Sequence, residues 1–164
     1  GIYIPSEKQQ AFRTVARLYM QAVGDRKRIR LRIKSFLHYN GVKIPPEDQL
    51  PSWSGRFVHW LNGIKFTQQE TEYHLKELIG QLEAYRKRTL EILKYMRLLA
   101  KENPIVALLR TIPGVGNITS FIVVAELMDM QRFKNVDRVA SFTGIVPSVS
   151  GTGDKEKVMG LTNR

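Results

Sequence analysis

Two long stretches of the chain carry apolar residues at alternating spacings of three and four, and these stretches constrain the fold most. The first follows Ser6, a residue type that caps helices, and runs to Asn40-Gly41. The second runs from about Thr67 to Asn103. A sustained seven-residue repeat predicts long helices that pack along one face. The repeat positions are Phe12, Val15, Tyr19, Ala22, Arg26, Ile29, Ile33 and Phe36, then Leu75, Leu78, Leu82, Tyr85, Thr89, Ile92, Met96 and Leu99.

A proline-containing connection joins these two stretches. Pro45, Pro46 and Pro51 prevent a long helix there, and the residues that follow are too apolar for a free linker. We expect a short helix over about residues 54–62 that packs as a cap on the long helices. Residues 1–104 are therefore predicted to form an antiparallel coiled-coil hairpin ~50 Å long, at ~1.5 Å per helical residue. Its apolar seams also predict a homodimer or higher oligomer through the coiled coil.

Positive charge is concentrated in the first of the two helices. The net charge is +11, and residues 1–44 contribute ten Lys and Arg against two Asp and Glu. Such a run is often only a solvated helix surface, but no acidic residue interrupts this one after Asp25. Contact with nucleic acid is therefore the favoured interpretation. The predicted DNA- or RNA-binding residues of the run are Arg26, Lys27, Arg28, Arg30, Arg32 and Lys34.

A proline–glycine turn lies between two apolar segments of the second predicted domain, residues 105–164. Pro113 is expected to end one helix, Gly114 and Gly116 to allow positive φ, and Asn117 to cap the next helix. Backbone N–H groups at such a turn can bind phosphate. The pattern resembles the helix-hairpin-helix, which binds the DNA backbone without reading sequence, although the glycines can equally serve only to turn the chain. The candidate binding residues here are Gly114, Val115, Gly116, Asn117 and Thr119.

The end of the sequence combines a short helix with a glycine-rich segment. Asn135 is expected to cap a helix from Val136 to about Thr143, and Gly144 to end it. Residues 148–157 are polar and are predicted to form a mobile loop. The hydroxyls of this loop, on Ser148, Ser150 and Thr152, are candidate nucleophiles. A hydroxyl needs a base or a metal for activation, and the only such groups nearby in sequence are in residues 154–156 (DKE).

Composition excludes several kinds of site. The chain has no cysteine, which excludes disulfides and cysteine-based zinc sites and is compatible with the cytoplasm. His38, His59 and His74 are scattered, so neither a metal site nor a cofactor is predicted for these residues. No apolar run is long enough to span a bilayer, and no signal peptide is visible. Because residue 1 is not Met, the chain is expected to be a piece of something longer.

Several short segments together resemble one protein family. They are residues 109–119 (LRTIPGVGNIT), 126–127 (EL), 132–134 (RFK), 139–147 (VASFTGIVP), 153–157 (GDKEK) and 161–164 (LTNR). They resemble the C-terminal domain of bacterial insertion-sequence transposases related to the Piv DNA invertase. The Arg-rich helix and the Trp-containing stretch before the second long helix fit the same family, so the resemblance covers nearly the whole chain.

The resemblance implies a transposase that moves an insertion sequence. Family members have an N-terminal RuvC-like domain whose four acidic residues (DEDD) bind Mg²⁺, then a coiled coil, then a helical domain that supplies a serine. This serine attacks DNA and forms a phosphoserine link, with the acidic site placed beside it across subunits. At least some relatives are guided by a structured RNA that the element encodes. The present residues begin after the acidic domain, so the resemblance implies that they are inactive alone, truncated at their end, and that Mg²⁺ belongs to the missing domain.

One departure from the family concerns the serine. The family has a Ser-Ser pair just before a Gly–acidic–Lys step, and this pair aligns here with Gly151-Thr152. Thr152 can replace the serine, Ser150 can take its role, or this copy is inactive. The catalytic candidates are therefore Ser150 and Thr152.

The predicted fold class is all-α, with a long antiparallel coiled-coil hairpin followed by a small helical domain that contains a helix-hairpin-helix-like motif. The predicted function is the DNA-binding and oligomerisation portion of a transposase, in the bacterial cytoplasm at the nucleoid. The predicted partners are DNA, a guide RNA and further copies of the chain, with no membrane. The alternatives are a non-catalytic nucleic-acid-binding coiled-coil module and a purely structural coiled-coil protein.

Overall fold

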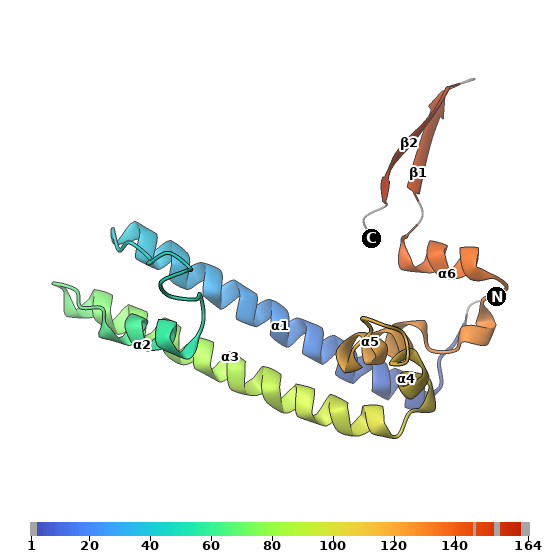
Figure 1. Ribbon diagram of the computed structural model, residues 1–164, viewed down its shortest axis with the longest axis horizontal. Helices are drawn as coiled ribbons and strands as arrows, with labels where there is room; N and C mark the ends of the chain where they lie inside the picture. Colours follow the sequence, from blue (N-terminus) through green and yellow to red (C-terminus); the bar gives the residue numbers. More distant parts are fainter. Residues whose placement is uncertain (1–2, 146, 153–154, 162–164) are drawn as a thin grey trace. The chain divides into compact units, whose positions relative to one another are not determined.

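The computed structural model describes residues 3–145, 147–152 and 155–161, with side chains described up to residue 145 (Figure 1). The elements, in chain order, are α1 (Glu7–Tyr39), α2 (Gly55–Gly63), α3 (Gln69–Lys101), α4 (Pro104–Leu109), α5 (Asn117–Leu127), the 3₁₀ turn η1 (Met130–Arg132), α6 (Val136–Thr143), β1 (Pro147–Thr152) and β2 (Lys155–Leu161). Over these residues, no helix combines the length and the apolar character needed to cross a membrane.

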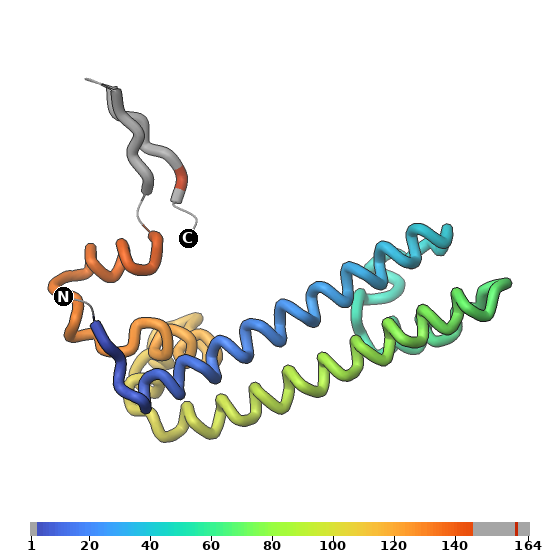
Figure 2. The backbone as a smooth tube through the Cα atoms, turned by 180° about the vertical axis from the view of Figure 1, so that it is seen from behind, coloured from blue at the N-terminus to red at the C-terminus, as the bar shows by residue number. Residues whose placement is uncertain are grey.

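The two long helices, α1 and α3, lie side by side and run antiparallel (Figures 1 and 2). α1 begins with a capping box, in which the Gln9 N–H donates to Ser6 Oγ at 3.3 Å and the Ser6 N–H donates to Gln9 Oε1 at 2.9 Å. It ends just before Gly41, whose φ of 70° carries little cost for glycine. Both helices match their predicted bounds within two residues, so the predicted antiparallel helical hairpin is confirmed.

One hydrophobic cluster joins α2 to the two long helices, and we call it the α2 cluster. Phe57 is fully buried there, with its ring centroid 5.0 Å from that of Trp53 and 5.3 Å from that of Trp60. Ser54 caps α2 by accepting the Phe57 N–H at 3.1 Å. The predicted capping helix is therefore confirmed. The buried members of the cluster are Ile29, Ile33, Leu37, Phe57, Val58, Leu61, Leu75, Leu78, Ile79 and Leu82.

A second hydrophobic cluster joins the other half of the helical hairpin to α4 and α5, and we call it the α5 cluster. Phe121 of α5 is buried against α1, where its ring stacks on that of Phe12 with 4.0 Å between centroids. Small buried residues from α1, α3 and α5 contribute to the cluster. The buried members are Ala16, Met96, Ala100, Val106, Phe121 and Ala125.

The chain forms two compact units, residues 6–126 and residues 127–164 with 1–5. α4 and α5 belong to the unit of the long helices, because their apolar faces are buried in the α5 cluster. The boundary predicted after residue 104 follows the helix break at Asn103-Pro104 and does not coincide with this division.

In the second unit, the described helix α6 has the predicted ends. The Asn135 side chain accepts the Arg138 N–H at 3.1 Å, and Gly144 ends the helix with a φ of 75°. Beside it, the Arg132 guanidinium lies over the rings of Phe133 and Phe142, at 4.3 and 4.4 Å from their centroids. These cation–π contacts attach η1 to α6.

The segment predicted as a mobile loop instead contains two antiparallel strands. β1 pairs with β2 in a register that sets Val149 opposite Val158 and Ser150 opposite Lys157. The mainly helical fold class is confirmed, and this hairpin is an addition to it. The loop prediction was wrong because Ser, Gly and Lys lack the apolar alternation that marks a strand. A signal was present in the sequence, since Gly-Asp dipeptides between two short runs are typical of hairpins.

Candidate nucleic-acid interface

The basic run of α1 has one apolar face and several cationic ones. Ile29 and Ile33 are buried in the α2 cluster, which fixes the helix face that turns inward. The side chains of Lys27, Arg28, Arg32 and Lys34 are exposed, whereas those of Arg26 and Arg30 are half-buried. Ile29 and Ile33 pack as their places in the seven-residue repeat predict, whereas Leu31, which lies between them in sequence, is 54% exposed. Contact of the cations with nucleic acid stays a prediction.

Only one carboxylate pairs with this run among the described residues. Asp25 accepts a charge-assisted hydrogen bond from Arg28, one turn further along the helix. The other five cations of the run have no ion pair in the part of the chain that the structure describes. Unpaired cations gathered on one helix produce the local positive potential that attracts a polyanion.

Arg30 occupies an unusual position within the run. Its guanidinium carbon lies 5.3 Å from the ring centroid of Trp53, and its Nε is buried without a hydrogen-bond acceptor among the described residues. Burial lowers the pKa of the Arg30 guanidinium, and the positive charges of Arg26 and Arg86 lower it further. Arg30 therefore remains a cation, but its surroundings oppose its charge rather than balance it.

The glycine turn differs in detail from its prediction. α4 ends at Leu109 rather than at Pro113, and Asn117 is the first residue of α5 rather than its cap. Gly114 has a φ of 83°, so it needs to be glycine, whereas Gly116 has no positive φ and nothing within 4 Å of where its Cβ would be. The turn therefore depends on one of the two glycines, and the backbone at the other is open to a ligand.

A cavity of about 270 Å³ lies beside this turn, within the same unit. Three cations line it: Arg97 and Lys101 from the last turns of α3, and Arg110 from the end of α4. Asn117, at the start of α5, and Ala100 complete the lining. The lining contains no carboxylate, so the cavity favours an anion. Of the predicted residues only Asn117 lines it, while Gly114, Gly116 and Thr119 are exposed nearby and Val115 is half-buried.

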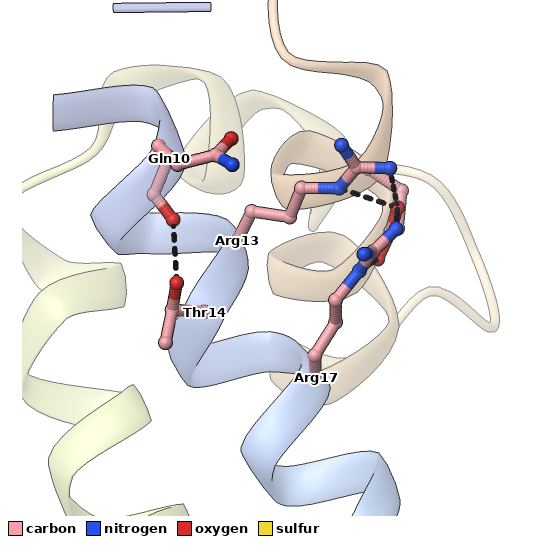
Figure 3. Close-up of polar contacts among 5 residues, drawn as sticks. Gln10, Arg13, Thr14 and Arg17 are labelled. Carbon is pink, nitrogen blue, oxygen red and sulfur yellow. Dashed lines mark hydrogen bonds and ion pairs between the residues drawn. The ribbon is translucent and has the colours of Figure 1, made fainter. Parts of the chain in front are cut away.

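α5 is attached to α1 by a shared carboxylate. Arg13 Nε donates to Glu126 Oε2 at 3.0 Å, and Arg17 Nε donates to Oε1 at 3.0 Å (Figure 3). Burial by itself raises the pKa of the Glu126 carboxyl, but hydrogen bonds from Arg17 and Arg13 and their charges outweigh burial and lower the pKa. Glu126 is therefore ionised at neutral pH and holds the helix that follows the glycine turn in place.

The remaining predicted residues lie apart from these features. Ser150 and Thr152 have backbone positions in β1, opposite Lys157 and Lys155, but their side chains lie outside the described residues. Among the described residues, no group of three or more His, Asp or Glu side chains lies close enough to hold a metal ion. Along the helical hairpin, the basic run and the glycine turn lie at separate places (Figure 1).

The C-terminal part of the chain, from α4 onward, is similar to a known protein family. Residues 106–164 match the family model described as "Transposase IS116/IS110/IS902 family". This segment of the chain is therefore similar to that transposase family. The matched segment begins within α4 and includes the glycine turn, α5, α6 and the β-hairpin.

Two curated transposases are similar to the chain. The transposase for insertion sequence element IS1111A of Coxiella burnetii is 32% identical over 69 residues, which is 42% of this chain and 19% of that protein. The transposase for insertion sequence element IS1328 of Yersinia enterocolitica is 24% identical over 172 aligned positions, which cover 97% of this chain and 46% of that protein. The chain thus spans less than half the length of these relatives. No solved structure matches it significantly.

Sequence reasoning missed four cations that the fold brings next to predicted sites. Arg97 and Lys101 are spaced by one helical turn near the end of α3 and belong to no basic run. Arg110 precedes the glycine turn by a few residues. Its position was the one sequence signal that a cation lies beside this turn. Arg86 interacts electrostatically with Arg30 across the two long helices, and no pattern within either helix predicts that proximity.

Proposed function

We propose that this chain is the helical-hairpin and C-terminal portion of a DEDD-plus-serine transposase related to the Piv invertase, and that it binds DNA during insertion-sequence movement. The family segment at residues 106–164 supports the assignment to a transposase. The basic run of α1 supports DNA binding, because five of its six cations lack a carboxylate partner among the described residues. This unpaired charge is the observation that carries the binding proposal. A nucleoid location follows from DNA binding.

The glycine turn is proposed as a second contact with the DNA backbone, of the helix-hairpin-helix kind. The exposed backbone at Gly116 and the cationic cavity lined by Arg97, Lys101 and Arg110 support this role. Backbone N–H groups at the start of α5 would meet a phosphate there, with the positive end of the helix dipole behind them. Such contacts position DNA without reading its sequence.

Self-association through α3 is proposed as well. The side chains of Leu90, Tyr95 and Leu98 are 62%, 53% and 53% exposed on this helix. Apolar side chains that remain exposed after α1 and α3 have packed are available to a second copy of the chain. A homodimer or higher oligomer would bring two C-terminal segments to one DNA complex, and a guide RNA would occupy part of the same basic surface.

For the chemistry, we propose that a hydroxyl of β1, from Ser150 or Thr152, attacks a DNA phosphate. The attacking oxygen bonds to phosphorus while a bridging P–O bond of the DNA breaks, and the proton lost by the protein hydroxyl balances the one that the leaving DNA oxygen gains to become a hydroxyl. Mg²⁺ would bind acidic residues of the longer protein, outside the present chain, and lower the cost of the charge that develops on the phosphate. On this proposal the present residues alone bind DNA without cutting it.

The binding proposal predicts a strong salt dependence. The logarithm of the association constant for a duplex of about 30 base pairs should fall linearly with the logarithm of salt concentration, with a slope steeper than about −4, because each neutralised phosphate contributes about −0.9. Fluorescence anisotropy between about 50 and 300 mM NaCl measures this slope. A flat line, or no binding at the lowest salt, would show that the basic run is only a solvated surface.

The nucleophile proposal requires the complete transposase. Replacing the true nucleophile, by Ser150→Ala or Thr152→Val, should reduce the covalent protein–DNA adduct by at least about 10³-fold and leave DNA binding within about twofold. Denaturing gels with labelled DNA measure the adduct, and Ser148→Ala is the control from the same strand. An adduct that persists in the double variant rules out both hydroxyls.

A further inference from the structure

The interface between α1 and α3 changes from apolar to cationic between its two hydrophobic clusters. With half-buried members included, the α2 cluster reaches Ile29 on α1 and Tyr85 on α3, and the α5 cluster reaches Tyr19 and Ile92. The turns between them carry small or polar buried residues, Ala22 and Thr89, and two half-buried arginines, Arg26 and Arg86. An antiparallel helical pair thus has a cationic segment within its long interface, where apolar residues would stabilise it more.

Arg30 adds a third guanidinium to this segment. It is half-buried, and Trp53 stacks against it at 5.3 Å between ring centroid and guanidinium carbon. Its buried Nε–H has no acceptor among the described residues, although a buried donor without a partner is costly and rare. The charges of Arg26 and Arg86 are close enough to lower the Arg30 pKa. Arg26 lies one helical turn before Arg30 on α1, and Arg86 is half-buried on α3 between the two clusters, so the three residues border the same part of the interface.

No group of the described residues neutralises this region. Asp25, which neighbours Arg26 in sequence, pairs with Arg28 instead. The Thr89 hydroxyl donates its hydrogen to the carbonyl of Tyr85 at 2.7 Å, within α3, and carries no negative charge that could neutralise an arginine. No carboxylate forms an ion pair with Arg26, Arg30 or Arg86 in the ranges that the structure describes.

Like charges held together, partly out of water, destabilise the free protein unless an anion joins them. We infer that Arg26, Arg30 and Arg86 form a phosphate-binding site for the backbone of a nucleic acid, located where the two long helices meet. A guanidinium fork matches two oxygens of a phosphate. Trp53 is a positioning residue that holds the Arg30 plane.

The charge around the site favours a polymeric anion over a single carboxylate. Lys27, Arg32 and Lys34 extend the positive surface along α1 on both sides of Arg30, with the Lys34 amine 6.0 Å from the Trp53 centroid. A phosphodiester chain places successive charges along such a surface, whereas one acidic side chain would engage only part of it. The inference rests on the proposed DNA-binding function and adds α3 and the Trp53 segment to its contact surface.

The test compares two variants that remove the same charge from α3, Arg86→Gln in the site and Arg88→Gln on an exposed face. Binding of the same duplex by the whole chain should weaken about tenfold in the first and less than about threefold in the second. In chloride alone, the Arg86→Gln variant should melt no lower than the unmodified chain, because a repulsion has been removed. Inorganic phosphate at constant ionic strength should raise the melting temperature of the unmodified chain and of Arg88→Gln, but not of Arg86→Gln.

The outcomes separate this site from the general binding proposal. If the unmodified chain does not bind DNA, the proposed function fails. If it binds and both variants weaken equally, the site does not exist and only diffuse charge attracts DNA. A marked loss of melting temperature in Arg86→Gln without phosphate would make Arg86 a structural residue and overturn the inference. If polyglutamate raises the melting temperature of the unmodified chain and phosphate does not, the ligand of the site is an acidic protein and not a nucleic acid.

Discussion

Replacing Arg26, Lys27, Arg28, Arg30 and Arg32 together with Gln is expected to weaken duplex DNA binding by about 10²–10³-fold near physiological salt. The variant should also reduce the salt slope by up to about 4.5, because each lost phosphate contact removes about 0.9 from it. The helix itself should persist, since Gln is a good helix former and the buried Ile29 and Ile33 are unchanged. Fluorescence anisotropy measures the binding, and circular dichroism confirms the helix.

A second set of five substitutions provides the matched control for this experiment. Lys43, Arg56, Lys76, Lys87 and Lys94 are exposed and lie on α2, on α3 or in the connection after α1. Their replacement with Gln changes the net charge by the same amount, so it reports the effect of charge alone. Binding should weaken much less than with the α1 variant. Equal losses in the two sets would show that the basic run has no special role.

The largest expected effect on stability comes from Phe121→Ala. Phe121 is 1% exposed, and its ring stacks on Phe12 where α5 meets α1. Removing the ring leaves a cavity in the α5 cluster and should lower the free energy of unfolding by about 3–5 kcal/mol. Because α5 starts at the glycine turn, backbone amides should also exchange hydrogen faster in α5, including at Asn117, which lines the cavity beside the turn.

Leu108→Ala is the control for this substitution. Leu108 lies on α4 in the same unit and is 67% exposed, so its truncation should change the free energy of unfolding by less than about 0.5 kcal/mol. Urea unfolding of the three proteins gives both values. A loss near 1 kcal/mol in Phe121→Ala would mean that α5 is held mainly by the contacts of Glu126 with Arg13 and Arg17.

The basic run of α1 and the cavity beside the glycine turn differ in how well the sequence predicted them. The basic run was visible, because its cations lie within nine residues of one another and the seven-residue repeat at Ile29 and Ile33 reveals the buried face. The cavity beside the glycine turn was only partly visible, because Arg97 and Arg110 are separated by a helix end and meet only after α4 folds back. The glycine turn was located, but its two glycines were given one role, and the backbone angles show that Gly114 alone needs a positive φ.

The sequence by itself determined the two long helices, their ends and their antiparallel pairing. Periodicity, capping residues and Pro or Gly breaks are local signals, and they act on the helix that contains them. It also determined the position of the positive charge. The tertiary structure alone decided that Arg86 of α3 lies near Arg30 of α1, that Trp53 covers this arginine, and that Glu126 joins α5 to α1. These contacts depend on the register between helices, which is set by the summed packing of many side chains and not by any single motif.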